Sequence, residues 1–360
     1  MQKVLPPVLL VLVALVPAGA DSPSRPMVEL TLHGRKIEGA PLAWNTREVC
    51  LLGRDGRLWQ FAPTEAEDFR KTSDRFQTYS TSELRAMLLR EVGGDFEVTG
   101  TSHYLVAHPR GQRSQWAQRF EDLYRSFFHY FSVRGFALQE PPCPLMGIVC
   151  RNRQEFLEYS ARRAVPAAPG VLGYYWLESN RIVLYDVSDP AADASDWQQN
   201  ASTLIHEATH QTAFNTGIHS RFTAPPLWVA EGLATMFEAP GVYNSRAFPR
   251  QADRINQEQL RQFQELAVPG HGPERLAELI ASDRPFRTRP SAAYATAWAL
   301  TFYLVETQPG RYADYLALTA GRPPLETYTA DERTADFAAV FGEDWQMLEA
   351  RFLRFMEGVK

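Results

Sequence analysis

The chain has 360 residues, of which 45% are hydrophobic and 22% are charged. This composition supports a packed core and excludes a globally disordered chain, and the length suffices for one large domain or two smaller ones. The formal net charge of −5 argues against a broad basic surface for phosphate backbones, so we expect no nucleic-acid partner.

The first twenty residues predict an export signal. A basic start at Lys3 precedes an apolar run over residues 4–16, and the A-G-A sequence at 18–20 fits a signal-peptide cleavage site. The run is too short to span a bilayer comfortably, and no later segment has 18 consecutive apolar residues. We therefore expect a mature chain without an integral membrane segment, exported to the periplasm, the cell envelope or the extracellular space.

Residues 27–61 alternate apolar and polar positions, which predicts a small β module of three or four strands. The sequence "GRDGR" at 53–57 is a hairpin signal within it. The polar stretch at 63–80 is typical of a linker, and 81–94 begins with helix-capping residues and ends in two glycines, as a helix does. Three regions are predicted: a signal peptide at 1–20, the β module with its linker at 21–75, and a larger domain at 76–360.

The larger domain begins with strands and continues with helices. Strand patterns occupy 95–100, 103–108 and 144–150, a hairpin pattern occupies 170–186, and helical patterns occupy 115–131 and 153–163. After residue 195 the pattern is helical throughout. Strands first and helices later indicate the α+β fold class.

The sequence "LIHEATHQTA" at 204–213 contains an H-E-x-x-H motif within a helix predicted over about 196–215. His206 and His210 are one turn apart and project from the same face, and Glu207 lies about 60° from His210 around the axis. Two neutral imidazoles can bind zinc, and the adjacent carboxylate can act as a base. The alternative is a polar, solvent-facing helix, but the apolar flanks indicate partial burial, where these side chains need partners.

A zinc site needs a third protein ligand and one open position. The sequence "PPLWVAEGLATMFE" at 225–238 predicts a second helix in which Glu231 lies among apolar residues, where an unpaired carboxylate is costly. Twenty residues separate Glu231 from His210, which allows the first helix to end at Gly217 and the second to pack back. Gly232 permits a close approach between helices.

Other ligand sets fit the sequence less well. A third histidine of the metzincin type requires glycine at position 213 and histidine at position 216, where this chain has Ala213 and Thr216. No C-x-x-C sequence occurs, so a cysteine zinc site is not predicted. His219 follows the expected helix end and is interpreted as an ordinary loop histidine, with a role as a metal ligand left open as the alternative.

These motifs together resemble the gluzincin, or peptidase MA-like, zinc metallopeptidases. The closer resemblance is to the domain of unknown function 1570 family, through the two motifs with "GYYWLESNRIVLYD" before them and "YATAWALTFYL" after them. It covers roughly residues 95–360. It implies a gluzincin-like fold with a small mixed sheet, an active-site helix and a helical C-terminal half. It also implies one Zn²⁺ per chain, bound by His206, His210 and Glu231.

The implied function is that of an exported zinc-dependent hydrolase, a peptidase acting on a peptide or protein substrate. Glu207 takes a proton from zinc-bound water and delivers it to the leaving amine. Tyr294 is the expected oxyanion donor and Tyr243 the competing one, while a core aromatic role for Tyr294 stays open. By analogy, a peptide adds as an extra strand to an exposed sheet edge formed by "RIVLY" at 181–185.

One position departs from the gluzincin pattern. Gluzincins often place an acidic residue four positions after the glutamate ligand to orient a ligand histidine, and here that position is Thr235. Thr235 can accept a histidine N–H, and Glu238 is a more distant substitute.

No motif predicts an organic cofactor. Two alternatives stay open: a catalytically inactive, zinc-stabilised envelope protein acting as a binding or scaffold module, and an envelope binding protein that recognises its partner through the β module.

Overall fold

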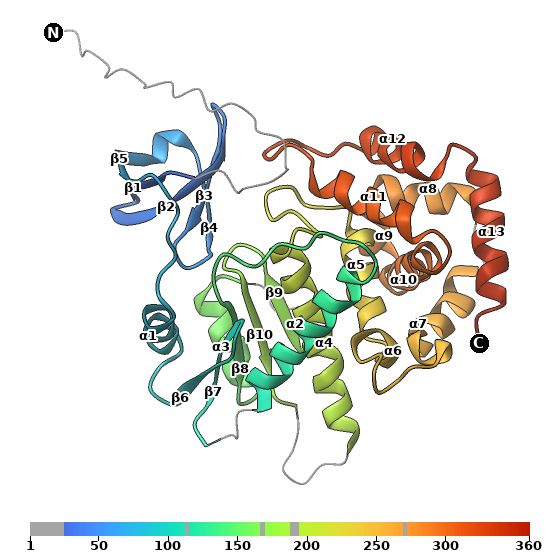
Figure 1. Ribbon diagram of the computed structural model, residues 1–360, viewed down its shortest axis with the longest axis horizontal. Helices are drawn as coiled ribbons and strands as arrows, with labels where there is room; N and C mark the ends of the chain where they lie inside the picture. The colour runs from blue at the N-terminus through green and yellow to red at the C-terminus, as the bar shows by residue number, and fades with distance from the viewer. Residues whose placement is uncertain (1–24, 112–114, 166–169, 188–193, 269–271) are drawn as a thin grey trace.

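The structure is a computed structural model, and it belongs to the α+β class, as expected, with two five-stranded sheets and a helical C-terminal half (Figure 1). The described residues are 25–111, 115–165, 170–187, 194–268 and 272–360. The predicted signal peptide at 1–20 lies outside them. Within the described ranges, no helix is long and apolar enough to cross a membrane.

The first sheet is antiparallel, with strand order β4-β3-β2-β1-β5. Its strands are β1 (Met27–Leu32), β2 (Arg35–Trp44), β3 (Val49–Gly53), β4 (Leu58–Phe61) and β5 (Ala66–Ser73). β5 lies within the segment predicted as a linker, so that prediction was wrong. The reason is that β5 is a charged edge strand with little burial on either face, which pairs with β1 through its backbone and needs no apolar alternation.

The second sheet is mixed, with strand order β6-β7-β8-β10-β9. Its strands are β6 (Phe96–Gly100), β7 (Tyr104–Pro109), β8 (Leu145–Cys150), β9 (Gly173–Trp176) and β10 (Arg181–Tyr185). The predicted exposed edge at 181–185 was wrong, because β10 pairs with β8 on one side and β9 on the other. Every residue of β10 is buried, as in an interior strand, and β9 forms the edge.

Helices cover both faces of the second sheet. Apolar residues of α1 (Thr81–Val92) and α3 (Arg153–Arg162) share one core with it. Residues of α2 (Gln115–Ser132) and α4 (Ala194–Asn215) share the core on the other face. α4 carries the H-E-x-x-H motif. Its packing against the second sheet fixes the position of the motif relative to the remaining helices.

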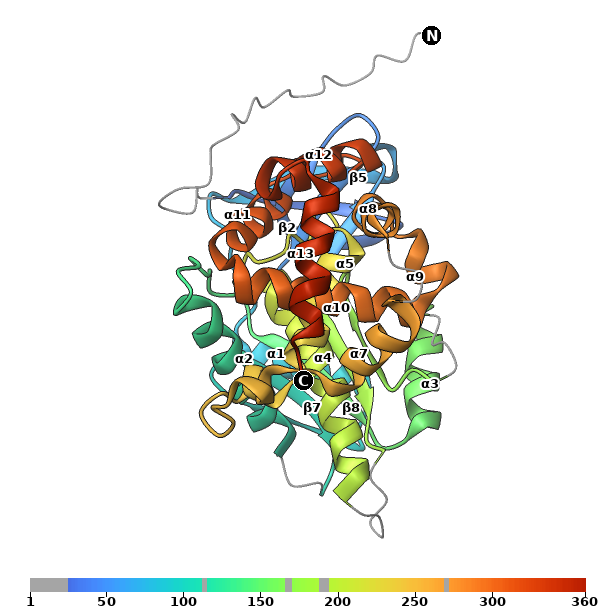
Figure 2. The same cartoon turned by 90° about the vertical axis from the view of Figure 1, so that its right-hand side faces the viewer.

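The C-terminal half packs around α10 (Figure 2). Its helices are α5 (Leu227–Phe237), α6 (Pro240–Tyr243), α7 (Gln257–Gln262), α8 (Pro273–Ala281), α9 (Arg284–Thr288), α10 (Pro290–Thr307), α11 (Pro309–Ala320), α12 (Ala330–Phe341) and α13 (Trp345–Glu357). A Cβ atom on Gly232 would lie 2.3 Å from Thr301 Oγ1 and 2.5 Å from Ala297 O. Gly232 thus allows a close helix approach, but the helix that it contacts is α10 and not α4, which carries the histidines.

The two sheets meet at their turns. The hairpin predicted at 53–57 connects β3 and β4, and Leu58 N–H donates to Glu178 O in the β9–β10 turn at 2.7 Å. Arg221 donates from Nη1 to Gly56 O at 2.8 Å and from Nη2 to Leu177 O at 2.7 Å. One buried guanidinium therefore connects both turns, although the division into domains at 21–75 and 76–360 stays a prediction.

Candidate metal centre

The helix that carries the motif ends where the sequence predicts. α4 ends at Asn215, and Gly217 has φ +89°, in the left-handed region that favours glycine. Leu204 and Ala208 face the second sheet, whereas Ile205 belongs to the core of the C-terminal half. α4 is thus held between the sheet and α5, as its apolar flanks indicate.

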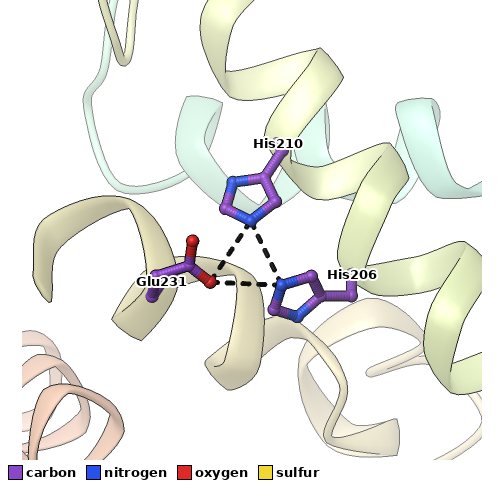
Figure 3. A group of neighbouring side chains, drawn as sticks. All are labelled: His206, His210 and Glu231. Atoms are coloured by element: carbon purple, nitrogen blue, oxygen red, sulfur yellow. Dashed lines mark hydrogen bonds and ion pairs between the residues drawn. The ribbon is translucent and has the colours of Figure 1, made fainter. Parts of the chain in front are cut away.

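Three nitrogen and oxygen atoms converge between α4 and α5 (Figure 3). His206 Nε2 lies 3.1 Å from His210 Nε2 and 3.3 Å from Glu231 Oε2, and His210 Nε2 lies 3.5 Å from the same oxygen. Ligands bound about 2.1 Å from a tetrahedral ion lie about 3.4 Å apart. Among the described residues, this is the group of His, Cys, Asp and Glu side chains with the geometry to hold a metal ion.

The electrostatics of the cluster favour a positive charge at its centre. Burial opposes ionisation of both Glu231 and His206. Nevertheless, His210 and His206 hold the pKa of Glu231 far below its usual range, while Glu231 and Glu238 raise the pKa of His206 well above its usual value. Because the converging atoms are Lewis bases, a bound cation can satisfy them in place of a proton.

Glu238 contacts the ring nitrogen of His206 that is not part of the cluster. His206 Nδ1 lies 2.8 Å from Glu238 Oε1, and Asn256 Nδ2 donates to Glu238 Oε2 at 3.0 Å. Donation from Nδ1 leaves the Nε2 lone pair free to face the centre. Thr235 instead donates its hydroxyl to Glu231 O at 2.6 Å. Of the two candidates that the sequence offers, the structure therefore selects the more distant one.

The expected base is held by the sheet edge. Glu207 Oε2 accepts a hydrogen bond of 2.6 Å from the backbone N–H of Tyr175 in β9. Its carboxylate also contributes to the raised pKa values of both His206 and Tyr294. Glu207 therefore borders the three converging atoms without being one of them, which leaves its carboxylate available for proton transfer.

The structure distinguishes the two candidate tyrosines. Tyr294, in the first turns of α10, has its pKa raised by burial and then by the carboxylates of Glu231 and Glu207. The pKa of Tyr243 is raised by burial alone, and this residue packs against the C-terminal core. The Tyr294 ring contacts Phe286 edge-on at 5.2 Å between centroids. The structure thus brings Tyr294 to the cluster and leaves Tyr243 outside it.

His219 differs from expectation. It lies in the loop after α4, as interpreted, but it is 2% exposed and is therefore buried, unlike an ordinary loop residue. Its backbone N–H donates to Ala213 O at 3.0 Å, so the segment after α4 folds back against the last turn of that helix. Burial and the nearby His210 lower the pKa of His219 to about 3, so a neutral imidazole lies close to the cluster. No local sequence pattern indicates this burial, because it depends on the path of the chain after Gly217.

The fold and this cluster define an α+β protein with a candidate metal site between two helices. A family model described as "Protein of unknown function (DUF1570)" matches residues 200–326, which include α5, Tyr294 and the H-E-x-x-H motif. The resemblance to that family is therefore confirmed over this segment. No curated protein matches the chain.

The solved structures that are similar to this chain include two of one enzyme. One is a mutant M1 zinc metallopeptidase from Deinococcus radiodurans, with 13% sequence identity and a TM-score of 0.39, covering 73% of this chain and 50% of that chain. The other is the mutant M1 zinc metallopeptidase from that organism bound to a Tyr-Ser-Ala substrate, with 13% identity and a TM-score of 0.40, covering 74% of this chain and 53% of that chain. The present chain spans about half the length of these enzymes.

Proposed function

We propose that this chain is an exported zinc-dependent hydrolase that cleaves amide bonds in peptides or proteins. The observation that carries the proposal is the convergence of His206, His210 and Glu231 beside the Glu207 carboxylate. Two nitrogens and one oxygen from three side chains match the donor set of a catalytic zinc site, which keeps a fourth position open. The proposed export rests on the sequence of residues 1–20.

In this proposal His206, His210 and Glu231 hold the metal. When bound, zinc supplies a Lewis acid that polarises a carbonyl group and makes water more acidic. Glu207, fixed by the Tyr175 N–H, accepts a proton and passes it to the leaving amine. Tyr294 has a raised pKa and stays protonated at neutral pH, so its hydroxyl donates a hydrogen bond to the developing oxyanion.

The proposal is tested by measuring zinc content and peptide cleavage on the same preparations. The parent chain, Glu207→Gln and His206→Ala are purified without added metal, analysed by elemental mass spectrometry and incubated with a peptide library. We expect about one zinc per chain in the parent and in Glu207→Gln, and almost none in His206→Ala. Cleavage by Glu207→Gln should fall by about 10²-fold or more, because the proton acceptor is lost.

Two other outcomes would contradict parts of the proposal. Equal zinc content with no measurable difference between the parent and Glu207→Gln would indicate a zinc-stabilised protein without this catalysis. A folded parent chain that binds no zinc, even when zinc is added, would remove the metal from the proposal altogether. Circular dichroism of each variant shows whether the comparison is made between folded chains.

A further inference from the structure

A cavity of about 550 Å³ lies where the two sheets meet. Its walls include residues of β4, of β9 and of the segment that joins α4 to α5. The lining residues used below are Leu58 and Gln60 of β4, Tyr175 and Trp176 of β9, and Phe222 and Ala224 of the joining segment. A volume of this size is within the range of about 300–1,000 Å³ that is typical of ligand pockets.

One residue, Tyr175, both lines the cavity and contacts the candidate active site. Tyr175 lines the cavity, and its backbone N–H is the group that donates to Glu207 Oε2 at 2.6 Å. β9 pairs with β10 on one side only, so its other side is a sheet edge. An extended peptide can pair with such an edge, and alternate side chains of the peptide then enter pockets beside it.

The residues that line the cavity favour an apolar ligand group over a charged one. Two charged residues line the cavity, and both already have partners. Glu178 forms an ion pair with Arg57. The Nη atoms of Arg221 donate to Gly56 O and Leu177 O, and its Nε is buried with no hydrogen-bond partner among the described residues. A charged ligand group would lose its hydration, and the Nη donors of the buried Arg221 guanidinium already bind carbonyl groups, whereas the aromatic and aliphatic walls favour an apolar group.

We infer that this cavity binds a large apolar side chain, aromatic or long aliphatic, of a peptide substrate held at the edge of β9. The inference rests on the proposed function, because Glu207 and its contact with Tyr175 define which edge the substrate approaches. It also gives the first sheet a role: Leu58 and Gln60 of β4 form part of the specificity pocket.

The test uses binding, so that it does not depend on catalysis. Zinc-loaded Glu207→Gln is titrated into fluorescein-labelled peptides that differ at one scanned position, occupied by Phe, Leu, Ser or Glu, and fluorescence anisotropy gives each Kd. At one position, Phe and Leu should bind about 10-fold more tightly than Ser and Glu, as expected from burial of a large apolar side chain.

Filling the cavity should remove this preference. Ala224 is exposed at the cavity, so Ala224→Trp, combined with Glu207→Gln, should reduce the advantage of Phe and Leu to less than about threefold. Gln60→Trp fills the same space from the first sheet and should act likewise. The matched control is Ala335→Trp on α12, an exposed alanine outside the lining, which should retain the full preference. Thermal unfolding identifies any variant that fails to fold.

The inference is overturned if no peptide binds, if all four residues bind equally, or if both cavity-filling variants keep the preference. Cleavage by the parent chain is measured separately. Selective binding to Glu207→Gln without any cleavage by the parent would support the pocket and reject the hydrolase. Cleavage without a side-chain preference would support the hydrolase and reject the pocket.

Discussion

At the scale of single residues, His206 is the most constrained member of the cluster. Its two ring nitrogens face different carboxylates, Glu231 at 3.3 Å from Nε2 and Glu238 at 2.8 Å from Nδ1. A neutral His206 that donates from Nδ1 to Glu238 has its Nε2 lone pair available to a metal. Asn256 in turn restrains the other oxygen of Glu238.

Replacing Glu238 should therefore weaken metal binding without touching a ligand. For Glu238→Ala we expect about 10–100-fold lower zinc affinity, measured by competition with a chromophoric chelator. Thr235→Val is the control, because the Thr235 hydroxyl contacts the backbone of Glu231 and not a histidine. Similar zinc affinities for both variants would contradict the assignment of Glu238 as the residue that positions His206.

Removing the hydroxyl of Tyr294 tests its role as an oxyanion donor. Tyr294→Phe should lower kcat by about 10²–10³-fold, because one donor to the transition state is lost, while zinc content stays at the parent level. Tyr243→Phe should leave kcat close to the parent value, since Tyr243 packs against the core away from the carboxylates. A larger effect at Tyr243 than at Tyr294 would reverse the assignment.

At the scale of elements, two adjacent residues of α5 contact two different helices, α4 and α10. Glu231 faces α4 and its histidines, and Gly232 lies against Thr301 and the backbone of Ala297 in α10. The absence of a side chain at 232 lets α10 pack closely behind the helix that carries the ligand. The position of Glu231 in the candidate metal cluster thus depends on a contact between α5 and α10 that other residues form.

Gly232→Ala should destabilise the fold. The added Cβ meets backbone and a buried threonine, so we expect a loss of about 1–3 kcal/mol in the free energy of unfolding, from denaturant titration. The control is Gly310→Ala in α11, where no atom lies within 4 Å of the added Cβ. There the higher helix propensity of alanine should stabilise by up to about 1 kcal/mol. Equal changes in the free energy of unfolding in both variants would show that the close contact between α5 and α10 does not stabilise the fold.

Several elements were predictable from local pattern, and others were not. The helices around His206 and Glu231 were predictable because apolar spacing, caps and a glycine stop act within one segment. β5 was not, since its charged residues pair through the backbone with a strand about forty residues earlier. The order of β9 and β10 was not predictable either, because it depends on which of them meets β8.

At the scale of the whole molecule, the first sheet contacts the larger domain through the turn between β3 and β4, by backbone hydrogen bonds, the Arg221 side chain and the Arg57–Glu178 ion pair. Arg221 is buried and its donors satisfy carbonyl groups on both sides of the junction. Gly56 lies in the hairpin with φ +80°, and a Cβ there would be 2.7 Å from Cys143 Sγ. The junction also borders the proposed specificity pocket, because Arg221 lines that cavity.

Arg221→Met should loosen this junction. The variant leaves two carbonyl groups without their donor, and we expect a loss of about 2 kcal/mol or more, with faster hydrogen exchange in β3 and β4. Arg70→Met on β5 is the control, because the Arg70–Glu29 ion pair is exposed, with Arg70 at 68%, and should contribute less than about 1 kcal/mol. Unchanged exchange in Arg221→Met would mean that the first sheet is held by other contacts.

The sequence by itself determined the chemical core of this protein: two histidines one turn apart, a glutamate beside them, and a second glutamate in an apolar helix. Helical periodicity and the cost of burying unpaired charge act over a few residues, so these features can be predicted from one segment at a time. Only the tertiary structure decided that Glu238 orients His206, that Tyr294 reaches the cluster, and that β9 forms the edge. Each of these depends on which distant segments meet.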